Sequence, residues 1–85
     1  MACQEFQGTI VVYSIIACPY CMKAKNLLNE HNLPFEEIRF DLYPQLRDVV
    51  TQKSGMKTVP QIYFNEVFIG GSVELQNLVS YMYQT

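Results

Sequence analysis

The sequence predicts a single α/β domain, residues 1–85, in which a four-stranded mixed sheet carries helices on both faces. The predicted order of elements is β-α-β-α-β-β-α. A strand–helix–strand opening implies two parallel strands joined by a right-handed crossover. Two short strands late in the chain, two residues apart, imply a hairpin that adds antiparallel strands. The chain has 85 residues, 49% of them hydrophobic and 16% charged, which suits one compact core.

The first strand and the first helix are predicted from their apolar patterns. Residues 9–14 (TIVVYS) are rich in β-branched and aromatic side chains and apolar on both faces, which suits a central strand covered on both sides. A helix is expected over about residues 19–31, because apolar residues recur at helical spacing from Ala24 to Leu28. Pro19 suits its first position.

The second strand and the second helix follow the same logic. Residues 35–40 (FEEIRF) alternate imperfectly between apolar and polar side chains, which is typical of a strand. Residues 44–54 predict a helix whose apolar residues, from Leu46 to Val50, share one face, and Gly55 is expected to end it.

The closing hairpin is predicted from two short apolar runs, residues 61–64 and 67–69, joined by a turn at Asn65 and Glu66. Two glycines at 70–71 end it.

The last helix is expected to begin after these glycines. Ser72 is predicted to be its N-cap, and Glu74 lies in the first turn, where the helix dipole favours an acid. The apolar stripe of this helix comprises Leu75, Leu78, Val79 and Met82.

Charge and hydropathy exclude several classes of protein. Six basic and eight acidic residues give a net charge of −2, so nucleic acid is not an expected partner. The longest apolar stretch, residues 10–18, is broken by Ser14 and stopped by Pro19, so no membrane segment is expected. The leading MACQEFQ lacks the positive region of a secretory signal, and we therefore expect a cytoplasmic location. We also expect a monomer.

The strongest chemical signal is the tetrapeptide Cys18-Pro19-Tyr20-Cys21, between a buried strand and a helix. Free backbone N–H groups and the positive helix end stabilise a thiolate there, so Cys18 is predicted to be a nucleophile. Cys21, one turn further and less exposed, can attack a mixed disulfide on Cys18 and release the substrate as a thiol. Tyr20 offers an aromatic wall to a bound thiol compound.

Two other interpretations of this cysteine pair are open. It is half of a zinc site only if two more ligands exist, and the remaining candidates, Cys3 and His31, lack a paired spacing. We therefore expect no metal site. The pair is alternatively two inert core residues, although Pro and Tyr between them make a poor packing pattern. Cys3 is interpreted as a free thiol near the N-terminus.

Along nearly its whole length the sequence resembles the glutaredoxins, thioredoxin-fold enzymes that use glutathione. The CPYC tetrapeptide is characteristic of dithiol glutaredoxins, Thr58-Val59-Pro60 matches the family's TVP segment, and Gly70-Gly71 matches its GG turn. The three motifs in this order are highly specific. The resemblance implies the thioredoxin-like fold and glutathione as co-substrate, with no tightly bound cofactor. It also implies partners that are disulfide-bonded or glutathionylated proteins.

The resemblance also implies roles for individual residues. Cys18 is the nucleophile and Cys21 its partner. Val59, before a cis-proline at Pro60, would pair its backbone with the cysteinyl part of glutathione. The remaining residues assigned to glutathione binding are Tyr20 and Thr58 beside the groove, the backbone N–H groups of Ser72 and Val73 for the γ-glutamyl carboxylate, and Arg47 for the glycine carboxylate. For Arg47 a solvated helix face is an equal alternative.

Two departures from the family pattern concern the site. The family commonly has Lys three residues before the nucleophile, and Ile15 stands there in this chain. After the two glycines the family often has Cys-Asp-Asp, and here the chain has Ser72-Val73-Glu74. These changes remove a cation, a thiol and an acid from the region of the site. They bear on substrate affinity and efficiency.

The function predicted from the sequence is therefore a glutathione-dependent thiol–disulfide oxidoreductase that reduces protein disulfides and protein–glutathione mixed disulfides. The alternatives are a glutaredoxin-like binding module with weak catalysis and a glutathione-ligated iron–sulfur carrier, which Pro19 disfavours by crowding the site. A thioredoxin-like enzyme is disfavoured because the chain has no Trp and lacks Gly-Pro between its cysteines.

Overall fold

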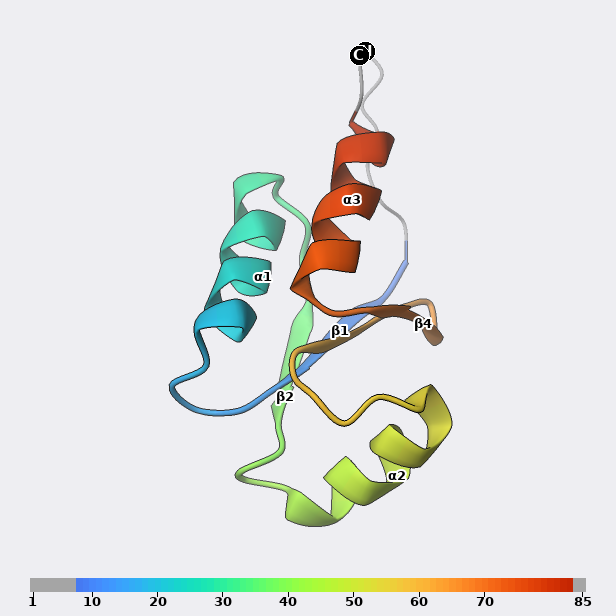
Figure 1. Ribbon diagram of the computed structural model, residues 1–85. Coiled ribbons are helices and arrows are strands. Elements are labelled where there is room, and N and C mark those ends of the chain that lie inside the picture. The colour runs from blue at the N-terminus through green and yellow to red at the C-terminus, as the bar shows by residue number, and fades with distance from the viewer. Residues whose placement is uncertain (1–7, 84–85) are drawn as a thin grey trace.

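The computed structural model describes residues 8–83, which form a sheet with helices on both faces (Figure 1). The predicted element order is confirmed. The elements are β1 (Ile10–Ser14), α1 (Pro19–Glu30), β2 (Glu36–Arg39), α2 (Pro44–Ser54), β3 (Gln61–Phe64), β4 (Val67–Gly70) and α3 (Ser72–Met82). Cys3, interpreted above as a free thiol, lies outside the described residues.

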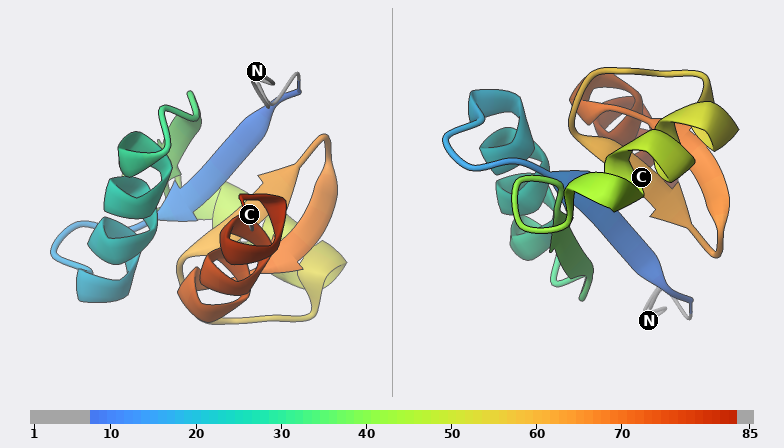
Figure 2. Two further views of the ribbon diagram at one scale, coloured as in Figure 1. Left: turned by 90° about the horizontal axis from the view of Figure 1, so that it is seen from above. Right: turned by 90° about the horizontal axis from the view of Figure 1, so that it is seen from below.

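The four strands form one mixed sheet in the order β2-β1-β3-β4. β1 runs parallel to β2, with Val12 opposite Glu37, and antiparallel to β3, with Val12 opposite Ile62. β3 and β4 form the predicted antiparallel hairpin. The two views of Figure 2 place α1 and α3 together on one face of the sheet and α2 on the other. The thioredoxin-like fold class is thereby confirmed.

The main core lies between the sheet and the α1–α3 pair. β1 alternates buried and half-buried residues, as expected of a central strand covered on both sides. Burying each large aliphatic side chain stabilises the fold by about 1.5–3 kcal/mol. The buried members of this core are Ile10, Val12, Ala24, Leu28, Leu33, Ile62, Phe64, Leu75 and Val79.

The helix and turn signals of the sequence agree with the structure, with one exception. Pro19 and Pro44 each occupy the first turn of a helix, and Gly55 ends α2 with a left-handed φ of 74°. Asn65 and Glu66 have φ values of 51° and 69°, as a tight hairpin turn requires.

The exception is the start of α3. Ser72 is not the N-cap, because the helix begins at Ser72 itself and Gly71 is the capping residue. The carboxylate of Glu74 accepts the backbone N–H of Gly71 at 2.8 Å. Gly70 is required in the preceding turn, since it has a φ of 122° and an added Cβ would lie 2.6 Å from the Glu74 side chain. The sheet therefore turns into α3 within two glycines.

Among residues 8–83 there is no helix with both the length and the apolar character needed to cross a membrane.

Candidate active site

The nucleophile predicted from the sequence stands where β1 has ended and α1 begins. Cys18 is the N-cap residue of α1, and its Sγ accepts the backbone N–H of Cys21 at 3.2 Å. Its side chain is mostly buried, with 8% of the residue exposed. Ala17, at a φ of 57°, turns the chain sharply before it. The sulfur thus lies at the positive end of the helix, beside backbone donors.

Cys21 lies one turn into α1 and is only 1% exposed. Burial, followed by its interaction with the Cys18 side chain, raises the pKa of the Cys21 thiol from 9.0 to about 12. The positive charge of Lys25 and a backbone hydrogen bond at Ile15 act in the opposite direction on the same pKa. Cys21 is therefore held as a neutral thiol, next to a sulfur that is closer to solvent.

An acidic residue from the end of β2 holds the loop before Cys18. Oδ1 of Asp41 accepts the backbone N–H of Ile16 at 3.2 Å. The same carboxylate pairs with the guanidinium of Arg39, which lowers the pKa of Asp41. The sequence analysis missed this tether. The residues are far apart in sequence, and only the parallel pairing of β1 and β2 brings them together.

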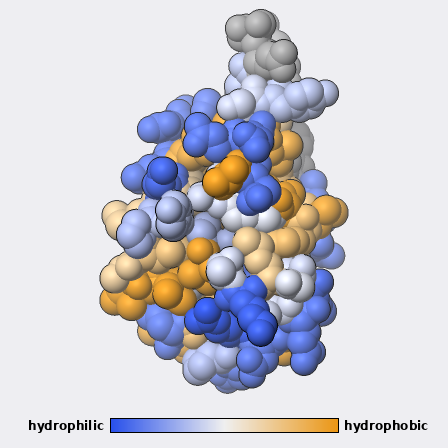
Figure 3. All heavy atoms as spheres, viewed as in Figure 1, coloured by the Kyte–Doolittle hydropathy of each residue, from blue (hydrophilic) through white to orange (hydrophobic). Residues whose placement is uncertain are grey.

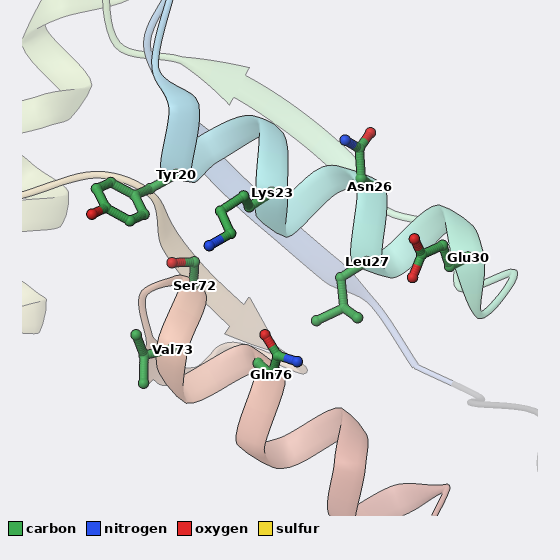
Figure 4. A pocket seen from close by; sticks show the side chains of 8 residues that line it. All are labelled: Tyr20, Lys23, Asn26, Leu27, Glu30, Ser72, Val73 and Gln76. Carbon is green, nitrogen blue, oxygen red and sulfur yellow. The ribbon is translucent and has the colours of Figure 1, made fainter.

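A groove runs between α1 and α3 and begins at the active-site tetrapeptide (Figure 4). Three predicted glutathione-binding residues line it: Tyr20 from α1, and Ser72 and Val73 from α3. Its volume is about 340 Å³. Lys23 projects into the same groove, with its Nζ 5.8 Å from the centre of the Tyr20 ring. The sequence analysis assigned no role to Lys23.

The segment containing Val59 and Pro60 lies beside the N-terminus of α3. The Val59–Pro60 peptide bond is cis, as the family resemblance implied. A Cβ added at Gly71 would lie 3.4 Å from the carbonyl oxygen of Pro60, so the two segments are in contact. Thr58 is exposed and Val59 half-buried, and neither is among the residues that line the groove of Figure 4.

Gln61 is a buried polar residue that fixes this segment. Its side chain is fully buried, and its Nε2 donates to the carbonyls of Met56 at 2.6 Å and Thr58 at 3.1 Å. Its Oε1 accepts the hydroxyl of Ser54 at 2.8 Å. The sequence analysis treated Gln61 only as a strand residue. A polar side chain at the start of a buried strand could have indicated this role, because a buried polar group needs hydrogen-bond partners and the adjacent loop provides them.

Arg47 is exposed on α2, and its side chain contacts two neighbouring segments. Its guanidinium donates to the carbonyl of Lys57 at 3.2 Å and lies 5.8 Å from the Phe40 ring. Arg47 thus reaches the segment before Val59 from α2, and it does not line the groove between α1 and α3.

Ile15 lies in a second, smaller cavity of about 190 Å³ next to both cysteines. Charged side chains from α1 and β2 surround it: Lys25, Glu37 and Arg39. The position is half-buried. This chain therefore lacks the lysine that the family commonly has at position 15, but Lys25 and Arg39 line the same cavity.

Exposed apolar side chains lie near Cys18, the predicted nucleophile. Figure 3 shows an apolar area over the loop between β1 and α1, where Ile16 is 63% exposed. Tyr20, Met22 and Val73 are also largely exposed. Exposed apolar side chains that lie together in this way are typical of surfaces that contact other molecules. Within residues 8–83, no cluster of three or more His, Cys, Asp or Glu side chains has the arrangement of a metal site.

These features define a thioredoxin-like domain with a Cys-x-x-Cys pair at the start of α1. The glutaredoxin family model matches residues 10–69. A curated glutaredoxin from Pseudomonas aeruginosa is 42% identical over 69 residues, which cover 81% of this chain and 82% of that protein. Glutaredoxin 1 from Rickettsia prowazekii is 43% identical over 72 residues, covering 82% of this chain and 76% of that protein. The chain belongs to the glutaredoxin family, and its function is that of a glutathione-dependent thiol oxidoreductase.

Solved structures agree with this fold. The solution structure of glutaredoxin from Brucella melitensis superposes with a TM-score of 0.76 at 34% identity, covering 91% of this chain and 84% of that one. A buckwheat glutaredoxin–glutathione complex has a TM-score of 0.81 at 23% identity, covering 87% and 70%.

Proposed function

We propose that the protein reduces protein disulfides and protein–glutathione mixed disulfides, with Cys18 as the nucleophile and Cys21 as the resolving thiol. The observation that carries the proposal is the hydrogen bond from the Cys21 backbone N–H to Cys18 Sγ at 3.2 Å. A sulfur that caps a helix is stabilised as a thiolate by backbone donors and by the helix dipole. The neutral, buried Cys21 is then available for the second step.

The removal of glutathione from a protein needs only Cys18. Its thiolate attacks the glutathione sulfur of the mixed disulfide, the original S–S bond breaks, and the protein thiolate leaves and takes a proton. The thiolate of a second glutathione then attacks the Cys18-bound glutathione. This step forms glutathione disulfide and regenerates the Cys18 thiolate. One free glutathione is consumed, and the other half of the glutathione disulfide is the glutathionyl group taken from the substrate.

The reduction of a protein disulfide needs both cysteines. Cys18 attacks one sulfur of the substrate and forms a mixed disulfide, which frees the first substrate thiol. Cys21 then loses its proton and attacks Cys18 Sγ, so the Cys18–substrate bond breaks and the second substrate thiolate takes up a proton. The enzyme is left with a Cys18–Cys21 disulfide, which glutathione reduces.

Glutathione is proposed to bind across the edge formed by Val59, Tyr20 and the start of α3. The backbone of Val59 would pair with the cysteinyl unit, as an edge strand does with an added peptide. The N–H groups of Ser72 and Val73 lie at the positive end of α3, where a carboxylate is favoured. Arg47, which also donates to the carbonyl of Lys57, is proposed to reach the glycine carboxylate of glutathione. Thr58 and Pro60 are proposed to border the groove on either side of Val59.

We further propose that the chain works as a monomer in the reducing cytoplasm, where the pair is kept ready for exchange. The test of the function is steady-state reduction of a small glutathione mixed disulfide, coupled to oxidation of glutathione. The wild type should turn over and Cys18→Ser should not. Binding of glutathione without turnover would favour the binding module instead, and visible absorbance after anaerobic reconstitution would favour the iron–sulfur carrier.

A further inference from the structure

An ion pair lies beside the resolving thiol, on the side of α1 that faces β2. Lys25 follows Cys21 by one helical turn, so both side chains lie on the same face of α1. Nζ of Lys25 lies 2.8 Å from Oε2 of Glu37 on β2. Both side chains line the cavity of about 190 Å³ that Cys18 and Cys21 also line. The pair therefore borders the space in which the two sulfurs react.

The position of this pair is fixed from the core. The fully buried hydroxyl of Ser14, at the end of β1, donates to Oε2 of Glu37 at 2.6 Å. The hydrogen bonds from Lys25 and then from Ser14 lower the pKa of Glu37, which is therefore a carboxylate at neutral pH. Each member of the pair retains 29% side-chain exposure. The ammonium of Lys25 is thus held near Cys21 and remains in contact with solvent.

We propose that the Lys25–Glu37 pair controls the resolving step, in which Lys25 stabilises the Cys21 thiolate by its charge while Glu37 holds and partly offsets that charge. The proposal rests on the proposed function, since it concerns the attack of Cys21 on a mixed disulfide at Cys18. Lys25 and Glu37 are positioning residues here, because they act through Cys21.

The chemistry of Cys21 explains why the charge matters. Because burial raises the pKa of the Cys21 thiol to about 12, this thiol is almost entirely protonated in the reduced protein at pH 7. When the mixed disulfide forms, the Cys18 thiolate is no longer present. Cys21 nevertheless stays buried, and burial is the largest cause of its raised pKa. A positive charge at this place lowers the pKa of Cys21, and Lys25 provides it.

Other charged groups near Cys21 leave this assignment intact. From β2, Arg39 also lines the cavity, but it is paired with Asp41. From α3, the side that faces α1 presents Ser72, Val73 and Gln76, which do not titrate, and Glu74 is engaged by the Gly71 N–H.

The remaining titratable groups on α1 point elsewhere. Tyr20, Lys23 and Glu30 line the groove towards α3. His31 stacks on Tyr83 at the far end of the helix, with 4.7 Å between the ring centres. Lys25 is accordingly the cation whose charge acts on the Cys21 pKa.

The proposal predicts opposite effects for the two halves of the pair. Lys25→Met removes the charge that favours the thiolate, so resolution should slow and its pH profile should move to higher pH. A shift of one pH unit lowers the thiolate fraction ten-fold, while the more basic thiolate reacts about three-fold faster, so a net loss of about three-fold is expected. Glu37→Gln leaves Lys25 uncompensated and should speed resolution and move the profile to lower pH.

The experiment uses an aromatic disulfide, 5,5′-dithiobis(2-nitrobenzoate), with the reduced protein in a Cys3→Ser background. Attack by Cys18 releases one coloured aryl thiolate and leaves a mixed disulfide. Attack by Cys21 on Cys18 Sγ then forms the intramolecular disulfide and releases the second aryl thiolate, while the Cys21 proton goes to solvent. The second phase measures resolution alone. Absence of the first phase would contradict the proposed function. If the first phase is normal, changes in the second phase test the role of the Lys25–Glu37 pair alone.

Matched variants separate charge from structure. Lys25→Arg keeps the charge and should restore the wild-type profile, while Lys53→Met on α2 makes the same chemical change away from the site and should leave both phases unchanged. Because the pair is partly exposed, added salt should reduce the difference between Lys25→Met and wild type. If Lys25→Met and Glu37→Gln moved the second phase in the same direction, or moved neither its rate nor its pH profile, the proposal would be overturned.

Discussion

The side-chain amide of Gln61 donates to the backbone carbonyl of Thr58 at 3.1 Å, so a fully buried group fixes the segment that carries Val59. The same nitrogen donates to Met56, and Arg47 donates to Lys57 from the other side. The proposed glutathione-binding backbone is therefore held in shape by the side chains of Gln61 and Arg47. Because the carbonyls of this segment are satisfied internally, its geometry is set before substrate arrives.

Replacement of Gln61 should damage both stability and glutathione binding. Gln61→Leu keeps the size of the side chain but leaves the carbonyls of Met56 and Thr58 without their donor, at a cost of about 1–3 kcal/mol. The KM for glutathione should rise as the segment loosens. Urea unfolding and the coupled assay measure the two effects. Gln52→Leu, on an exposed face of α2, is the control and should change stability by less than about 0.5 kcal/mol.

The buried thiol of Cys21 should make the protein sensitive to alkali. The pKa of Cys21 is raised from 9.0 to about 12, first by burial, so the folded state holds this proton more tightly than the unfolded state. Its contribution to the free energy of unfolding is complete below pH 9.0 and is lost as the pH rises towards 12. Urea unfolding of the reduced protein at several alkaline pH values should show a steeper loss in wild type than in Cys21→Ala. Parallel curves for the two proteins would contradict the assignment, because tyrosines and lysines titrate equally in both.

The sequence predicted the elements well because their signals are local. A proline at the first turn, a glycine in the left-handed region and a two-residue turn act within a few residues, as at Pro19, Gly55 and Asn65. Ser72 misled the prediction because serine is a good N-cap, while the sheet ends so close to α3 that Gly71 takes that position. The position of the hairpin, and not the N-cap preference of serine, therefore determines that Gly71 caps the helix.

The contacts that surround the cysteines were not predictable in the same way. Ser14 and Glu37 are 23 residues apart, and the register of β1 against β2 brings them together. Lys25 and Glu37 are 12 residues apart, and they meet only because α1 lies beside β2 in the folded protein. Alternation along a strand does indicate which side chains share a face, but it does not identify the helix residue that meets them. The two cysteines were recognisable because their spacing alone carries the chemistry.

The two cysteines should have separable roles. Cys21→Ser should keep the removal of glutathione from a protein, which needs one thiol, and should lose the reduction of a protein disulfide, which needs resolution. Cys18→Ser should lose both activities. Measuring both reactions on both variants in a Cys3→Ser background provides the test. If Cys21→Ser lost the two activities equally, Cys21 would have a role in the first step that the proposal does not give it.

A positive charge at position 15 would have two opposing effects, since it would favour glutathione binding but would be partly buried next to other cations. Ile15 stands where the family commonly has Lys, which leaves the glycine carboxylate of glutathione to be compensated by Arg47 or Lys57. A charge-assisted hydrogen bond contributes about 1.5–3 kcal/mol, so its absence should weaken glutathione binding by about ten- to a hundred-fold relative to a lysine-bearing relative. Yet Ile15 is half-buried beside Lys25 and Arg39, where a further cation meets both desolvation and like charge.

We expect Ile15→Lys to tighten glutathione binding and raise turnover, because the long lysine side chain can extend from the half-buried position to solvent and keep its charge hydrated. Glu37 and Asp41 lie on the same side of the molecule and offset part of the added charge. The gain should shrink as salt is added, since a partly exposed charge is screened. Ile16→Lys is the matched control, because Ile16 is 63% exposed on the same loop and a lysine there lies in solvent. Thermal unfolding and the coupled assay are measured together on both variants. A stably folded Ile15→Lys protein with unchanged activity would show that position 15 does not limit the enzyme, whereas equal gains in both variants would assign the effect to the net charge of the loop.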